Sequence, residues 1–128
     1  MFNCIYLKQE VVDDLFDLES QGAKGFIAKQ VGRFLSGIPE HIEGIEAAIE
    51  TNDFEKIRHH AHKLNGFSGT LGAYKIREIT LLIERDSIDK NPDSMSEHFG
   101  NLTAVIEKVS PELEEIARIS ERNVTYVK

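Results

Sequence analysis

One stretch, HHAHKLNGFSGTLGA at residues 59–73, shows the pattern that decides the fold. Counted from a few residues upstream, its apolar side chains recur at helical spacing, at Phe54, Ile57, Ala61, Leu64 and Leu71. A helix turns by about 100° per residue, so these side chains share a sector of about 100° and form one buried face. The pattern predicts an amphipathic helix that is capped by Asn52 or Asp53 and ends at Gly72.

The same spacing recurs upstream, and alternating strand patterns are nearly absent. We expect a short first helix that ends before Gln21. A second helix around residues 26–35 should stop near Gly37, and a third around residues 42–49 should begin after Pro39.

Downstream, a helix is expected from Ala73, followed by a turn-like segment at residues 86–94. The chain should be helical again from about Met95, with an interruption at Ser110–Pro111, either as a kink or as the start of a new helix. Amphipathic helices with short links bury their apolar faces against one another. We therefore expect an all-α fold, an antiparallel up-and-down four-helix bundle with an extra N-terminal helix, with residues 1–128 forming a single domain.

Composition narrows the range of functions. Fifteen Lys and Arg residues against 22 Asp and Glu residues give a net charge of −7, which argues against a nucleic-acid partner. No segment approaches the roughly 18 apolar residues of a membrane span, and the N-terminal residues do not resemble a secretion signal. Cys4 is the only cysteine, so there is no disulfide framework. These features predict a cytoplasmic domain.

The three histidines of the opening stretch differ in direction. Relative to His62, the apolar face of the helix is centred at about 220°, while His59 lies at about 60° and His60 at about 160°. We therefore interpret His60 as a packing residue at the edge of the core, and His59 and His62 as exposed. A glycine inside a helix costs about 1 kcal/mol relative to alanine, so Gly66, one turn after His62, needs an explanation. We interpret it as leaving space above the His62 ring, and the alternative is that it permits tight helix packing.

The segment AHKLNGFSGTLGAYKIREITLLIE, residues 61–84, resembles the signature of histidine-containing phosphotransfer (HPt) domains. That signature is approximately AHxLKG, then small residues, LGA, and a following helix that ends in LE. The residues that match at the same spacing are Ala61, His62, Leu64, Gly66, Leu71, Gly72, Ala73 and Glu84. Residues 26–57 are also similar to the helices that precede the signature in this family.

The resemblance implies a phosphoryl carrier without kinase activity of its own. His62 would accept a phosphoryl group from the aspartyl phosphate of one receiver domain and donate it to another. Glu84 would accept a hydrogen bond from Nδ1 of His62 and orient the ring. The implied partners are response-regulator receiver domains and a (hybrid) histidine kinase. No cofactor is expected on this chain, since Mg²⁺ would be bound by the receiver, and we expect a monomer.

One position departs from the family pattern. Asn65 occupies the place of the usual lysine, whose cation can attract the phosphoryl group. Asn65 can donate a hydrogen bond but supplies no charge. Lys63 follows His62 directly and so projects about 100° around the helix, which makes it a poor substitute. Arg58, one turn before His62, is a candidate for the missing charge, with a solvated surface arginine as the equal alternative. An alternative function is therefore a non-transferring HPt-like module that only binds a receiver or kinase. A metal site at His59 and His62 is a weaker alternative, because no third ligand is evident.

Overall fold

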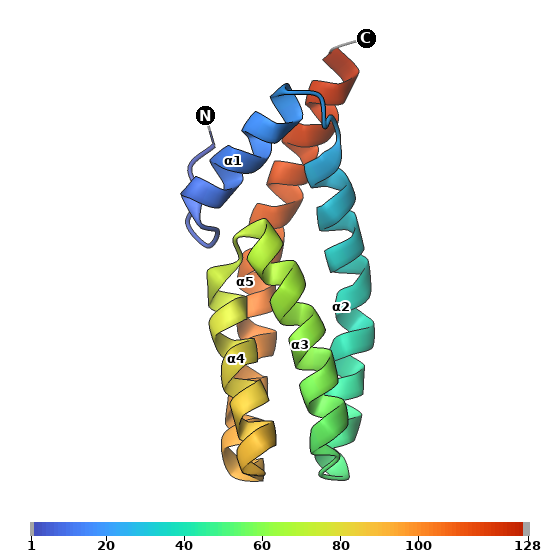
Figure 1. The fold of residues 1–128 in the computed structure, drawn as a ribbon, viewed down its shortest axis with the longest axis vertical. Coiled ribbons are helices and arrows are strands. Elements are labelled where there is room, and N and C mark those ends of the chain that lie inside the picture. Colours follow the sequence, from blue (N-terminus) through green and yellow to red (C-terminus); the bar gives the residue numbers. More distant parts are fainter. Residues whose placement is uncertain (1, 127–128) are drawn as a thin grey trace.

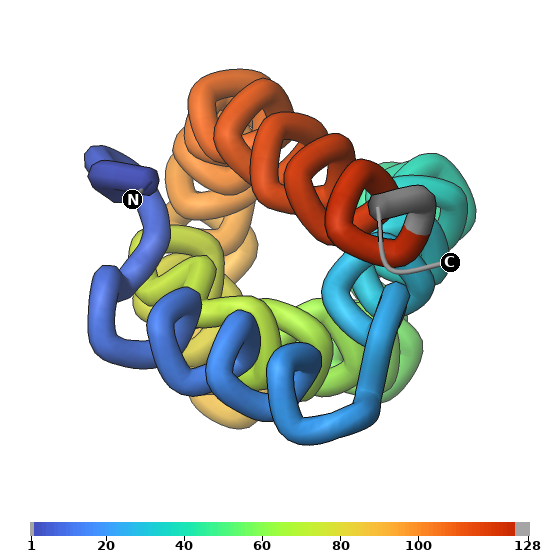
Figure 2. Tube along the Cα trace, turned by 90° about the horizontal axis from the view of Figure 1, so that it is seen from above, coloured from blue at the N-terminus to red at the C-terminus, as the bar shows by residue number. Residues whose placement is uncertain are grey.

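The computed structural model describes residues 2–126 and contains no strand within that range. The helices are α1 (Gln9–Ser20), α2 (Phe26–Glu50), α3 (Phe54–Leu71), α4 (Tyr74–Asp89) and α5 (Pro92–Tyr126). Helices α2 to α5 form an antiparallel up-and-down bundle (Figure 1). The first turns of α2 and the last turns of α5 extend past α3 and α4, and α1 lies across that end (Figure 2). The predicted fold class is thus confirmed.

The core is formed by the apolar faces of all five helices. The apolar face predicted for residues 54–71 is buried: Ile57, Ala61, Leu64 and Leu71 are all 0% exposed. Facing side chains come from the neighbouring helices, among them Phe34, Ile45, Ile83, Leu102 and Leu113. Burial of one such aliphatic side chain contributes about 1.5–3 kcal/mol, so this shared face fixes the rotation of α3 in the bundle. Among the described residues, no helix is both long and apolar enough to cross a membrane.

The ends of α3 are set by local signals. The side chain of Asp53 accepts a hydrogen bond from the Lys56 backbone N–H at 3.2 Å, as expected of an N-cap. Gly72 has φ 73°, a left-handed conformation that glycine adopts without strain, and the Ala73 N–H donates to the Ser68 carbonyl at 2.8 Å. Both the cap at Asp53 and the stop at Gly72 are confirmed. The sharp turn brings α4 antiparallel to α3 and directly beside it.

The predicted break near Gly37 and Pro39 is wrong, because α2 runs through both residues. Phe34 lies before the break and Ile45 after it, and both are buried on the same face of α2. Pro39 is exposed. Its main cost is one helical hydrogen bond, because proline has no N–H to donate to the carbonyl four residues earlier. Packing of a continuous apolar face outweighs that loss.

The turn predicted at residues 86–94 is much shorter in the structure. Helix α4 continues to Asp89, Lys90 adopts a left-handed conformation with φ 54°, and α5 begins at Pro92. The Ser94 N–H donates to the Asn91 side chain at 3.2 Å, which caps α5. The polar residues that indicated a turn are therefore used as helix-end signals, and the turn itself needs only two residues.

Helix α5 also continues through Ser110 and Pro111, where a kink or a new helix was expected. Val109 and Leu113 are both fully buried on either side of the proline. The Ser110 hydroxyl donates to the Ile106 carbonyl at 2.7 Å within the helix. As in α2, an exposed proline is tolerated because the buried face continues across it.

Helix α1 is fastened to the bundle by backbone groups and two carboxylates. The Lys8 N–H donates to the Gly72 carbonyl at 2.8 Å, and Glu112 accepts from the N–H of Leu7 at 2.9 Å. At the other end of α1, the carboxylate of Glu19 is 4% exposed and accepts from the Ile27 N–H at 2.7 Å. Glu19 thus satisfies a free backbone N–H at the start of α2.

Candidate phosphoryl-acceptor site

His62 projects from the middle of α3 into solvent. Its side chain is 80% exposed, in agreement with the direction predicted from helical angles. The side chain of Glu84, on α4, is only 17% exposed. The structure therefore brings an exposed imidazole and a largely shielded carboxylate together across the α3–α4 interface.

A hydrogen bond joins the two side chains. Nδ1 of His62 lies 3.0 Å from Oε1 of Glu84. A carboxylate only accepts hydrogen bonds, so Nδ1 carries the proton and donates. In the neutral ring this leaves Nε2, on the opposite edge of the imidazole, unprotonated and available as a nucleophile.

Two shallow hollows flank His62. One is lined by Gln30, His62, Lys63, Gly66, Phe67 and Thr70, and the other by Glu55, Arg58, His59 and His62. Arg58 therefore shares a hollow with the ring, as its position one turn earlier predicted. Lys63 does so as well, although its angle on the helix had argued against it. The length and flexibility of a lysine side chain explain the difference, and no signal in the sequence would have shown it.

Gly66 is exposed in α3, and a Cβ atom built at this position would meet nothing within 4 Å. Close packing between helices therefore does not require a glycine here. The alternative explanation, that Gly66 permits tight helix packing, is wrong. Because Gly66 has no side chain, space stays open in the hollow that it shares with His62.

Comparison with known proteins decides the family. A family model described as "Hpt domain" matches residues 30–120, more than two thirds of the chain. The chain belongs to the Hpt domain family.

Solved structures share the fold of this Hpt domain. Phosphotransfer protein ZmHP2 from maize matches with a TM-score of 0.81 and 22% identity, covering 93% of this chain and 88% of that one. HptB from Pseudomonas aeruginosa PAO1 matches with a TM-score of 0.79 and 16% identity, covering 91% and 97%. A putative histidine-containing phosphotransfer protein from rice matches with a TM-score of 0.77 and 18% identity, covering 91% of this chain and 83% of that one. No curated protein matches the sequence.

Asn65 of the Hpt domain is turned toward α4. Its side-chain N–H groups donate to the hydroxyl of Thr80 at 3.3 Å and to the carbonyl of Arg77 at 3.5 Å. The residue is partly buried, so its amide links α3 to α4. Its predicted contact with a phosphoryl group stays a prediction, and in this conformation its donors are already used.

His60 packs between α2 and α3, as predicted. Its Nδ1 lies 3.0 Å from Nδ1 of His41, which is 9% exposed on α2. A Cβ at Gly44 would overlap the His60 ring, so the glycine makes room for it. Burial lowers the pKa of both histidines, because a desolvated ring disfavours the charged form. A neighbouring histidine lowers each pKa further: His60 lowers that of His41, and His59 lowers that of His60.

The weaker alternative, a metal site at His59 and His62, gains no third ligand from the fold. His41 is paired with His60, and His98 is paired with Asp86 on α4. Across residues 2–126, no group of three or more His, Cys, Asp or Glu side chains could hold a metal ion.

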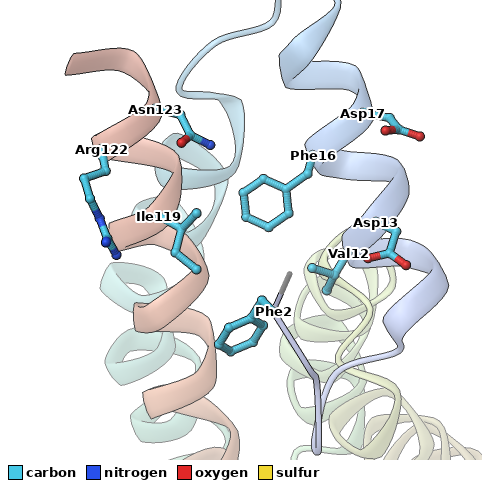
Figure 3. Close-up of a pocket in the computed structure, with 8 residues that line it drawn as sticks. All are labelled: Phe2, Val12, Asp13, Phe16, Asp17, Ile119, Arg122 and Asn123. Atoms are coloured by element: carbon cyan, nitrogen blue, oxygen red, sulfur yellow. The ribbon is translucent and has the colours of Figure 1, made fainter. Parts of the chain in front are cut away.

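A hollow larger than the two beside His62 lies away from these residues. It has a volume of about 580 Å³ and is located between α1 and the end of α5. Figure 3 shows Phe16 from α1 and Ile119 from α5 facing each other across it, with Phe2 at its base. No predicted site residue lines it, so size alone would have indicated the wrong location.

Proposed function

We propose that this Hpt domain is a phosphoryl carrier in a phosphorelay. His62 accepts a phosphoryl group from the aspartyl phosphate of a receiver domain and passes it to another receiver. The observation that carries the proposal is the exposed side chain of His62, whose Nδ1 is hydrogen-bonded to Glu84, which leaves Nε2 without a proton in the neutral ring.

The hydrogen bond to Glu84 suits the chemistry at both stages. In the attack, the lone pair of Nε2 forms the N–P bond while the P–O bond to the receiver aspartate breaks and its carboxylate leaves. The proton remains on Nδ1, so the phosphorylated ring of His62 is an imidazolium. The Glu84 carboxylate, 3.0 Å from Nδ1, stabilises that positive charge, and the reverse reaction follows the same path.

Transfer of this kind depends mainly on positioning and charge neutralisation. Arg58 and Lys63 line the two hollows beside the ring and supply positive charge where Asn65 does not. The bound Mg²⁺ belongs to the partner receiver, and this chain needs no cofactor. Its sequence has no Gly-rich phosphate loop, so we infer a carrier without kinase activity. The net charge of −7 discourages self-association, so we infer that it works as a monomer.

The test is incubation with a receiver domain that carries ³²P on its aspartate. We expect alkali-stable, acid-labile label on the wild-type chain and none on His62→Gln. His59→Gln is the matched control, because that histidine is also exposed on α3, and it should accept label normally. Receiver binding without any label would instead support the alternative, a module that only docks.

A further inference from the structure

Helix α4 carries a row of exposed apolar side chains that the core does not use. Tyr74, Leu81 and Ile88 are 37%, 47% and 62% exposed. They are seven residues apart, so they share one face of α4 over a length of about 21 Å. We call these three residues the α4 row. The buried face of the helix is formed by other residues, including Ile76, Thr80 and Ile83.

The α4 row adjoins the candidate acceptor. Glu84 follows Leu81 by three residues and precedes Ile88 by four, which places it beside both on the helix surface. Leu81, Glu84 and Ile88 line one shallow hollow, together with Arg85 and Asp89. Because Glu84 also binds His62, the apolar surface is continuous with the phosphoryl-acceptor site.

The size of a protein interface indicates what covers this surface. A specific interface buries about 800 Å² on each partner, which corresponds to a disc with a radius of about 16 Å. On the surface of α4, the Cβ atoms of Leu81 and Ile88 are each about 6 Å from that of Glu84. Oε1 of Glu84 lies 3.0 Å from Nδ1 of His62. A partner that brings an aspartate to Nε2 of His62 therefore covers both Leu81 and Ile88.

On the other side of the ring, the hollow is lined by Gln30, Lys63 and Thr70, which are polar, and by Phe67, which is only partly exposed. Interfaces draw their affinity mainly from a few desolvated apolar or aromatic residues. We propose that Leu81 and Ile88 of the α4 row form the apolar anchor of the receiver-binding surface. This inference rests on the proposed function. The net charge of −7 opposes a second copy of the chain as the occupant.

The test compares Leu81→Ser and Ile88→Ser with Leu82→Ser. Leu82 is 44% exposed, nearly as much as Leu81, but it points about 100° away around α4. Affinity is measured by calorimetry against a panel of beryllofluoride-activated receiver domains. We expect Leu81→Ser and Ile88→Ser each to weaken binding about five- to thirtyfold, and Leu82→Ser less than about twofold.

Two further measurements separate this inference from the proposed function. Labelling of His62 by phosphoramidate, which needs no docking, should be unchanged in all three variants, and circular dichroism should show intact helices. Equal affinities for Leu81→Ser, Ile88→Ser and Leu82→Ser would overturn the inference even if transfer occurs. Self-association that sedimentation shows to depend on Leu81, with receiver affinity unchanged, would overturn it in favour of a second copy. Binding that depends on Leu81 without transfer would overturn only the carrier function, and no binding to any receiver would overturn both.

Discussion

Gly66 offers a test in which stability and function should move in opposite directions. Replacing an interior helix glycine by alanine gains about 0.8–1 kcal/mol of helix stability. The added Cβ meets nothing within 4 Å, so no packing penalty offsets that gain. An unfolding entropy of about 2.1 cal/mol/K per residue gives about 270 cal/mol/K for this chain, so Tm should rise by about 3–4 °C.

The same methyl group enters the hollow that Gly66 shares with His62. We expect Gly66→Ala to slow phosphoryl transfer from a receiver severalfold, and the larger Gly66→Leu to slow it at least tenfold. Thermal denaturation followed by circular dichroism gives the stability, and rapid-quench transfer of ³²P gives the rate.

Gly100→Ala is the matched control. This glycine is exposed in α5, and a Cβ there also meets nothing within 4 Å. It should gain similar stability without a change in transfer rate. A wild-type rate in Gly66→Leu would refute the reasoning that the glycine provides access to His62.

Four other predictions concern the same helices. The pKa values of His41 and His60 are lowered in the folded chain, so as the pH falls these two rings take up protons in the unfolded chain before they do so in the folded one. Their contribution to the free energy of unfolding is therefore fully present above about pH 6.5. Below that pH it falls by at most about 1.4 kcal/mol per pH unit for each ring. Urea denaturation at pH 7.5 and 5.5 checks this, and equal stabilities at the two pH values would contradict it. Gly44→Ala should destabilise by about 1–2 kcal/mol, since overlap with His60 outweighs the gain in helix propensity, and the double variant with His60→Ala should remove the loss; an additive double variant would show that the two sites are independent. Glu84→Gln keeps an acceptor for Nδ1 but no charge, so transfer should slow about tenfold, the difference of about 1.4 kcal/mol between a charged and a neutral acceptor, while Glu84→Ala should slow it further; equal rates in both variants would remove the charge from the mechanism. Arg58→Ala should slow transfer about two- to fivefold, the effect of one exposed charge, and its effect should shrink in high salt; an unchanged rate at low salt would identify Arg58 as a solvated surface residue.

The features that sequence predicted correctly are those with local causes. The amphipathic face of α3, the cap at Asp53 and the stop at Gly72 each depend on residues within one or two turns. The break predicted at Pro39 failed because α2 packs as one continuous face, and a local helix-breaking signal does not reveal what lies opposite. The same reason explains the continuous α5.

Contacts between helices were harder to predict. The position of Glu84 came from family resemblance, since a spacing of 22 residues between it and His62 has no meaning until α3 and α4 are placed side by side. The contact of His41 with His60 was missed. A signal was present, because His41 lies seven residues after Phe34 and four before Ile45 on the buried face of α2, and Gly44 stands beside it.

That histidine contact has a consequence for the reacting ring. His60 and His62 are two residues apart on α3, yet one is held by His41 on α2 and the other by Glu84 on α4. Rotation of α3 about its own axis would break both contacts, so the azimuth of the nucleophile is fixed before any partner arrives. Docking of a partner then costs little orientational entropy. A substitution at the contact of His41 with His60 would also change the angle at which the His62 ring attacks, although the substituted residue does not contact that ring.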